Sequence, residues 1–162
     1  MKRSSIKIKQ HDITDSGAAC LSSVATHYRL KFPIARIRQE AFAGQKSVSV
    51  SAMIEAAKKM GLEAKDVKGS LVCLTDSPKP AVAYMIAKEV LHHFVVIYQV
   101  TKKYVRLMDP SDGKMHKKSH EDFNKEWTGV LILLRPLDTH NTAQVKKTIF
   151  QGLVDVLIRA FK

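Results

Sequence analysis

The sequence contains little cysteine, no long apolar run and few acidic residues. Its two cysteines, Cys20 and Cys73, form no CxxC pair and lie at no metal-ligand spacing with the histidines, which argues against a disulfide framework and a zinc site. The first residues, MKRSSIKIKQHD, lack the apolar segment of a signal peptide, and the longest apolar run, residues 81–87, is far shorter than the about 20 residues that span a membrane. We therefore expect a soluble chain that starts in the cytosol, with reduced thiols and neither a metal nor a cofactor.

The charge is strongly one-sided, because 27 lysine and arginine residues stand against 15 aspartate and glutamate residues, for a net charge of +12. Such a charge attracts nucleic acid or an anionic membrane surface. The lysine pairs are scattered, however, and neither an aromatic-interleaved basic motif nor a helix-turn-helix pattern accompanies them. We expect solvated basic faces near a membrane and no nucleic-acid partner; a nucleic-acid-binding protein is the alternative that charge alone suggests.

The length of 162 residues and the apolar content of 45% suit one globular domain followed by a tail. Helical periodicity predicts helices over residues 16–29 and 34–42 and within 47–60, where Gly61 stops the last one. Short β-branched and aromatic runs predict strands after it, with a helical turn or two over 119–126; the strands are residues 81–86, 93–100, 104–108, 114–118 and 129–134. Helices first and an antiparallel sheet second is an α+β plan, and we place this domain at residues 1–136.

Residues 137–162 form the tail. A mostly polar linker over 137–142 leads into a predicted basic amphipathic helix over 143–162, whose apolar stripe is Val145, Ile149, Leu153, Val156, Leu157 and Phe161. Two interpretations stay open: the helix covers the core of its own domain, or it lies on a membrane or leads into one.

Four residues have the types and places that nucleophilic acyl transfer requires: a nucleophile, a base, a group that orients the base, and a donor for the oxyanion. Ser16 opens the first helix, where free N–H groups and the helix dipole stabilise negative charge, and the Gln10 amide lies just upstream. His93 begins one predicted strand and Asp109 ends the next, so a hairpin through residues 101–103 would place both at one end of the sheet. This is the papain-like arrangement, with aspartate in the orienting role. Taken singly, these residues are also compatible with a helix cap, a surface glutamine, a structural histidine and a turn.

Several separated motifs carry a resemblance. They are QHDITDSGAACLSSVATHY, KPAVAYMI, HFVVIY, the Asp109-Pro110 pair and EDFNKEWTGVLILLRP, in unbroken order over roughly residues 6–136. They resemble the N-terminal peptidase domain of bacterial peptidase-containing ABC transporters, the bacteriocin-processing, double-glycine leader peptidases. The resemblance implies a papain-like cysteine peptidase fold with N-terminal helices packed on an antiparallel β-sheet. It matches position 16 to the nucleophilic cysteine, His93 to the general base, Asp109 to the acid that orients it, and Gln10 to the oxyanion-hole donor.

The resemblance also implies a substrate and partners. The family cleaves a helical leader peptide after a Gly-Gly pair, and the freed cargo leaves through the transporter. A membrane domain and an ATPase domain that uses ATP and Mg would follow this chain, at the cytoplasmic face of the bacterial inner membrane. We expect the isolated domain to be a monomer and the full-length protein a homodimer, with the tail approaching the membrane domain. The alternative is a degenerate, non-catalytic peptide-docking domain of a secretion transporter.

Ser16 departs from the family, which has cysteine there. Cys20 is no replacement, because it lies one helical turn deeper among apolar residues and is expected to be packed. The residues leave three interpretations open: an engineered substitution that disarms a cysteine peptidase, a natural serine in a domain that only binds, and a working serine nucleophile. The retained Gln10, His93 and Asp109 favour the first, and the weak acidity of a serine hydroxyl counts against the third. We expect an endopeptidase by family whose Ser16 form is catalytically dead.

Overall fold

The N-terminal part of the domain is helical. The computed structural model describes residues 5–10, 13–45, 47–88, 90–137 and 154. A short 3-10 helix, η1 (Ile13–Asp15), runs directly into α1 (Ser16–His27), which is followed by α2 (Ile34–Ala41) and α3 (Val50–Lys59). The Ser49 hydroxyl caps α3 by accepting a hydrogen bond from Ala52 N at 3.1 Å, and Gly61, with φ of 81°, follows its end. The three predicted helices are confirmed, apart from their terminal residues.

Strands and two short helices make up the rest of the described chain. The strands are β1 (Leu62–Lys68), β2 (Ala81–Ala87), β3 (Leu91–Val100), β4 (Tyr104–Asp109), β5 (Lys114–Ser119) and β6 (Trp127–Pro136), with α4 (Leu71–Asp76) after β1 and α5 (His120–Glu126) before β6. They form one sheet in the order β1-β6-β2-β3-β4-β5, and every pairing is antiparallel. The predicted α+β fold class is confirmed, and so are all five predicted strands. The sequence pattern predicts neither β1 nor α4.

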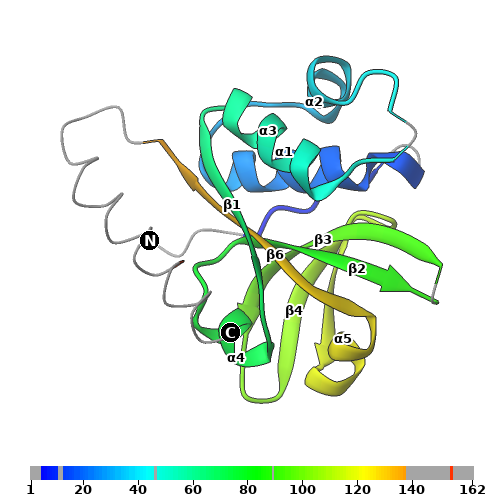
Figure 1. Cartoon of the computed structure of the whole chain (residues 1–162), viewed down its shortest axis with the longest axis vertical. Coiled ribbons are helices and arrows are strands. Elements are labelled where there is room, and N and C mark those ends of the chain that lie inside the picture. The colour runs from blue at the N-terminus through cyan, green and yellow to red at the C-terminus, as the bar shows by residue number, and fades with distance from the viewer. Residues whose placement is uncertain (1–4, 11–12, 46, 89, 138–153, 155–162) are drawn as a thin grey trace.

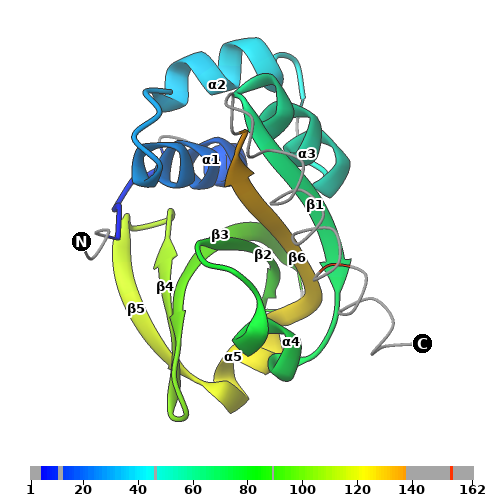
Figure 2. The same ribbon diagram turned by 90° about the vertical axis from the view of Figure 1, so that its left-hand side faces the viewer.

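The sheet separates two apolar clusters, because alternate side chains of a strand point to opposite faces. Val82, Phe94 and Val96 belong to the cluster shared with α1, α2 and α3, whereas neighbouring strand residues belong to the cluster shared with α4 and α5; these are Ala81, Ala83, Val95 and Ile97. Helix α1 packs on β3 and α3 packs on β1 and β6, while α2 packs against α1 and α3 (Figures 1 and 2). The start of α1 is therefore buried between helices and sheet.

The β3–β4 hairpin brings distant residues to one end of the sheet. Val96 pairs with Met108 and Val100 with Val105, so the predicted hairpin through residues 101–103 is confirmed. The segment before η1 crosses the same end, where Gln10 N donates a hydrogen bond to Pro110 O at 2.8 Å. The chain approaches the β4–β5 turn so closely that a Cβ at Gly113 would lie 2.9 Å from Lys9 N. The beginning of the chain is thus held beside the start of β3 and the end of β4.

The predicted tail helix over residues 143–162 lies outside the described residues, apart from Val154. The Val154 side chain is buried in the apolar cluster on the α4 and α5 side of the sheet. Among the helices of the described part of the chain, none has the length and apolar character needed to cross a membrane.

Candidate active site

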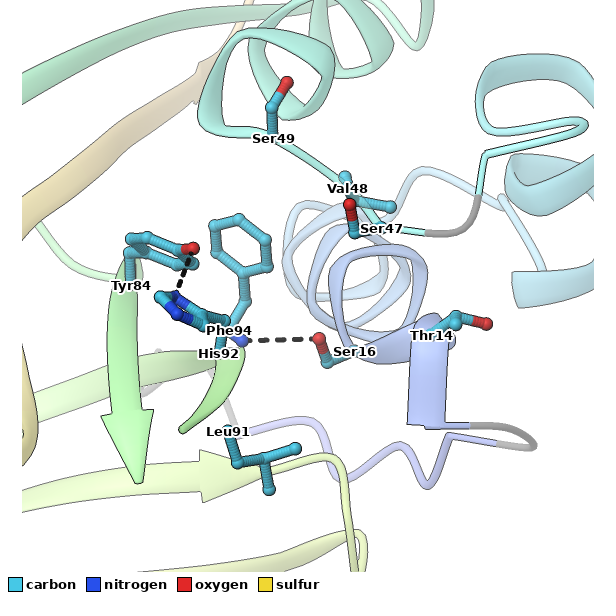
Figure 3. A pocket seen from close by; sticks show the side chains of 9 residues that line it. All are labelled: Thr14, Ser16, Ser47, Val48, Ser49, Tyr84, Leu91, His92 and Phe94. Atoms are coloured by element: carbon cyan, nitrogen blue, oxygen red, sulfur yellow. Dashed lines mark hydrogen bonds between the residues drawn. The ribbon is translucent and has the colours of Figure 1, made fainter. Parts of the chain in front are cut away.

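Residue 16 lies at a buried helix tip that is docked on strand β3. Ser16 is the first residue of α1 and is only 6% exposed, and its hydroxyl accepts a hydrogen bond from Phe94 N at 3.3 Å (Figure 3). Gly17 follows it at a point of close approach, because a Cβ there would lie 2.7 Å from Met53 Sδ. The packing of this tip therefore holds residue 16 next to the residue that follows His93.

His93 and Asp109 lie together at the end of the β3–β4 hairpin. His93 Nε2 is 3.8 Å from Asp109 Oδ2, and their side chains are 14% and 23% exposed. The carboxylate is fixed from the other side, where Asp109 Oδ1 accepts a hydrogen bond from Ser111 N at 2.9 Å. The second ring nitrogen of His93, Nδ1, lies 3.4 Å from Leu91 O. The structure thus brings together the residues predicted to act as base and orienting acid.

Gln10 lines the same cavity as this His93–Asp109 pair. The cavity has a volume of about 370 Å³, and its walls are Gln10, Ala87, Leu91, His93, Asp109 and Ser111. The hydrogen bond from Gln10 N to Pro110 O positions the residue beside the end of β4. Three of the four predicted site residues therefore surround one space, although they come from the N-terminal segment, β3 and β4.

Ser16 lines a neighbouring cavity of about 460 Å³ between the start of α3 and strands β2 and β3 (Figure 3). The other lining residues are Thr14, Ser47, Val48, Ser49, Tyr84, Leu91, His92 and Phe94. Leu91 is a wall of both cavities, so the two spaces adjoin at this side chain. The papain-like arrangement implies a direct approach of Ser16 Oγ to a ring nitrogen of His93. The Ser16 hydroxyl accepts a hydrogen bond from Phe94 N, one residue further along β3, and its approach to the His93 ring stays a prediction.

His92 also lines the Ser16 cavity, and sequence reasoning gave it no role there. Tyr84 OH and His92 Nδ1 are 2.8 Å apart, and the Tyr84 ring packs against Phe94 with centroids 5.0 Å apart. His92 and His93 line different cavities because side chains alternate along a strand. His92 and Phe94 share one face of β3, while His93 points to the other. This pattern is the signal that separates the two adjacent histidines.

Asp15, directly before Ser16, forms an ion pair that sequence reasoning missed. It is the N-cap residue of α1, but its side chain makes no capping hydrogen bond. Asp15 Oδ2 instead contacts Arg38 Nη2 on α2; the Asp15 side chain is 3% exposed and that of Arg38 is 44% exposed. Both residues line a third cavity of about 240 Å³, which shares Thr14 and Val48 with the Ser16 cavity. The pair therefore lies next to position 16 and within reach of solvent.

The two cysteines are structural. Cys20 is fully buried in α1, as predicted, and Cys73 is buried in α4. Burial raises the pKa of the Cys20 thiol well above its ordinary value, and the negative charge of Asp109 raises it further. A thiol in this state is a poor nucleophile, so Cys20 cannot take over from residue 16. In the described residues, no cluster of three or more His, Cys, Asp or Glu side chains could hold a metal ion.

A nucleophile position at a helix tip, a histidine–carboxylate pair on an adjacent hairpin and a glutamine beside them define the class of papain-like peptidases. Residues 5–139 match the Peptidase C39 family, and the chain therefore belongs to this family of cysteine peptidases.

Curated relatives are larger transport proteins. The chain is 31% identical over 131 residues to the lactococcin-G-processing and transport ATP-binding protein LagD of Lactococcus lactis subsp. lactis, a match that covers 80% of this chain and 18% of LagD. It is 31% identical over 153 residues to the pediocin PA-1 transport/processing ATP-binding protein PedD of Pediococcus acidilactici, covering 93% of this chain and 21% of PedD. The chain thus spans about a fifth of the length of these relatives.

Solved structures of similar domains share the fold. The peptidase domain of Streptococcus ComA, a bi-functional ABC transporter involved in quorum sensing, has a TM-score of 0.76 and 31% identity; the match covers 82% of this chain and 99% of that domain. A double glycine motif protease from an AMS/PCAT transporter, in complex with the leader peptide, has a TM-score of 0.75 and 25% identity; the match covers 83% of this chain and 94% of that one.

Proposed function

We propose that this chain is the peptidase domain of a peptide exporter and that its cysteine form cleaves leader peptides after a Gly-Gly pair. The observation that carries the proposal is the cavity in which Gln10, His93 and Asp109 meet, beside the buried helix tip that holds residue 16. Membership of the family supports the class of reaction. Relatives named for processing and transport, and a related protease that holds a leader peptide, support the class of substrate.

Each site residue has one role in this reaction. A thiolate at position 16 attacks the carbonyl carbon of the second glycine, and the carbonyl oxygen becomes an oxyanion to which the Gln10 amide donates a hydrogen bond. His93 protonates the departing amine, which frees the cargo peptide, and then removes a proton from the water that hydrolyses the thioester. Asp109 holds the imidazole in orientation and stabilises its protonated form.

The Ser16 cavity accounts for the selection of glycine. Val48, Tyr84, Leu91 and Phe94 line this space, and we expect an extended Gly-Gly end to enter it beside residue 16, where a larger side chain would clash. The rest of the leader would dock as an amphipathic helix on an apolar surface and provide most of the affinity. Replacing the apolar residues of that leader helix should weaken binding to the Ser16 chain in titration calorimetry, and an unchanged affinity would contradict helix docking.

Ser16 makes the chain as given a binding form with negligible turnover. A helix N-terminus and an adjacent imidazolium can keep a thiol ionised before the substrate arrives. A serine hydroxyl is a far weaker acid and must lose its proton during the attack. Loss of the nucleophile in such a unit removes several orders of magnitude of rate.

A cleavage assay on a double-glycine leader peptide tests this with three forms: the chain as given, Ser16→Cys, and Ser16→Cys with His93→Ala. We expect activity in the second form alone, and a thiol alkylator should abolish it. Equal activity of the first two forms would identify a serine peptidase instead. Inactivity of Ser16→Cys on a panel of leaders would favour a peptide-docking domain, the candidate that Ser16 itself suggests.

We also propose that this domain works within a transporter, at the cytoplasmic face of the cell membrane. Its partners would be the leader peptide and the membrane and ATPase domains of its own protein, and the ATPase domain would bind ATP and Mg. The isolated domain is expected to elute as a monomer in size-exclusion chromatography, and the full-length protein as a homodimer. The size of the relatives, about five times that of this chain, supports further domains.

A further inference from the structure

The carboxylate of Asp15 places a negative charge directly before the nucleophile position. The Asp15 side chain is only 3% exposed, and the residue lies at the N-cap of α1, directly before residue 16 begins the helix. The structure gives Asp15 an ion-pair partner on another element, the Arg38 guanidinium of α2. A buried carboxylate beside a residue that must itself become negative needs such compensation.

The size of the effect follows from Coulomb's law. At an effective dielectric constant of about 20, two negative charges about 7 Å apart shift a pKa by about one to two units. An uncompensated Asp15 would therefore hold a thiol at position 16 largely protonated near neutral pH. The positive charge of Arg38, in contact with the carboxylate, opposes this repulsion.

The other charged or titratable groups near position 16 belong to β3, to the end of the β3–β4 hairpin and to the interior of α1. His92 lines the same cavity from β3, and the His93–Asp109 pair lies beyond Leu91 at the end of the hairpin. Cys20, one helical turn deeper, is neutral because burial raises its pKa. Among the described residues, the Asp15–Arg38 pair supplies the charges near position 16 on the side of α2.

We propose that Arg38 is a positioning residue of this active site: its guanidinium neutralises Asp15 and thereby allows residue 16 to carry the negative charge of a thiolate. The inference deepens the proposed function and rests on it for the thiol at position 16. Arg38 also lines the cavity that adjoins the Ser16 cavity at Thr14 and Val48, so direct contact with a bound peptide is the competing role for this side chain.

The test is the pH dependence of alkylation of Ser16→Cys by iodoacetamide, which needs no peptide substrate. The chain as given is the blank, because its two cysteines are both buried. Adding Arg38→Gln should raise the midpoint of the reaction by about one to two pH units, whereas Arg38→Lys should keep it near that of Ser16→Cys. Combining Asp15→Asn with Arg38→Gln should return the midpoint towards that of Ser16→Cys.

A matched control lies on the same helix. Arg36 pairs with Glu40 at 2.9 Å, but both side chains are more than half exposed, and Arg36→Gln should leave the midpoint unchanged. An unchanged midpoint of alkylation in a folded Arg38→Gln variant overturns the proposal. If that variant also loses cleavage activity, Arg38 contacts the bound peptide instead. If circular dichroism shows that Arg38→Gln does not fold, Asp15→Asn alone should lower the midpoint, and no shift there also overturns the proposal. Absence of cleavage in every form would defeat the proposed function but would leave the comparison of midpoints valid.

Discussion

Replacing Asp109 by asparagine in the Ser16→Cys form tests whether the hairpin pair works as a unit. Asparagine keeps the shape of the side chain and removes its charge. At the observed 3.8 Å, the attraction between the carboxylate and a protonated His93 is roughly 1 kcal/mol with the dielectric constant of water and about 4 kcal/mol with an effective value of 20. Both side chains are mostly buried but reach solvent, so the loss should fall between these limits. Since about 1.4 kcal/mol corresponds to a factor of ten, we expect kcat/KM to fall by about 10-fold to 1,000-fold.

The assay is steady-state cleavage of one double-glycine leader peptide by Ser16→Cys with and without Asp109→Asn. Asp112→Asn is the matched control. Asp112 lies in the same β4–β5 turn, and its Oδ2 is 2.8 Å from Nε2 of another histidine, His116, but it does not line either cavity that holds a predicted site residue. The control should keep its activity, while the loss in Asp109→Asn should appear in kcat more than in KM.

A kcat/KM in Asp109→Asn close to that of Ser16→Cys alone would refute the reasoning. His93 would then act without its carboxylate, and the 3.8 Å pair would be only a structural feature of the hairpin end. Equal losses in Asp109→Asn and Asp112→Asn would refute it as well, because they would point to disruption of the turn rather than to the charge at His93.

Three further predictions concern packing and burial within the domain. Gly17→Ala should lower the free energy of unfolding by about 1 to 3 kcal/mol in urea titrations, because its Cβ would press on the buried Met53 Sδ; an unchanged midpoint would show that Met53 can move. Cys20 should resist alkylation in the native chain up to about pH 9 and react in urea, as measured by mass spectrometry, because burial raises its pKa; native labelling would contradict its packing. Burial lowers the pKa of Lys79 to about 8, against its ordinary value of 10.5, so the folded chain binds fewer protons than the unfolded chain between those values. The free energy of unfolding of the parent should therefore rise relative to Lys79→Met from about pH 8 to pH 10.5, and a fall would reverse the assignment.

The residues that alternate or repeat regularly are those whose structure could be predicted. The strands at residues 81–87 and 91–100 are rich in β-branched and aromatic side chains. The apolar residues of α1 recur at helical spacing, although every residue from Ser16 to Ala25 is buried. Strand β1, LEAKDVK, contains one β-branched residue and no aromatic residue, and its apolar–polar alternation breaks at Asp66, so its strand signal is weak. Its identity depends on pairing with β6, about half of the domain away in sequence.

Part of the candidate site could likewise be predicted from the sequence, and part could not. The positions of His93 and Asp109 follow from a local hairpin, and strand alternation assigns the two adjacent histidines to different cavities. The Asp15–Arg38 pair could not be predicted, because it joins two helices whose relative placement depends on the packing of both against the sheet. The hydrogen bond from Phe94 N to Ser16 depends equally on how α1 is docked on β3.

The place of β6 in the sheet has a consequence for synthesis of the protein. β6 is the last described strand, yet it lies in the interior of the sheet, with β1 on one side and β2 on the other. A ribosome adds about 5 to 20 residues per second, so for several seconds after its synthesis β1 has no strand to pair with. The helix that holds the nucleophile position is made first, but the sheet beneath it closes only when residue 136 has left the ribosome. A nascent chain is therefore unable to present a finished site to a leader peptide until the whole domain has been translated.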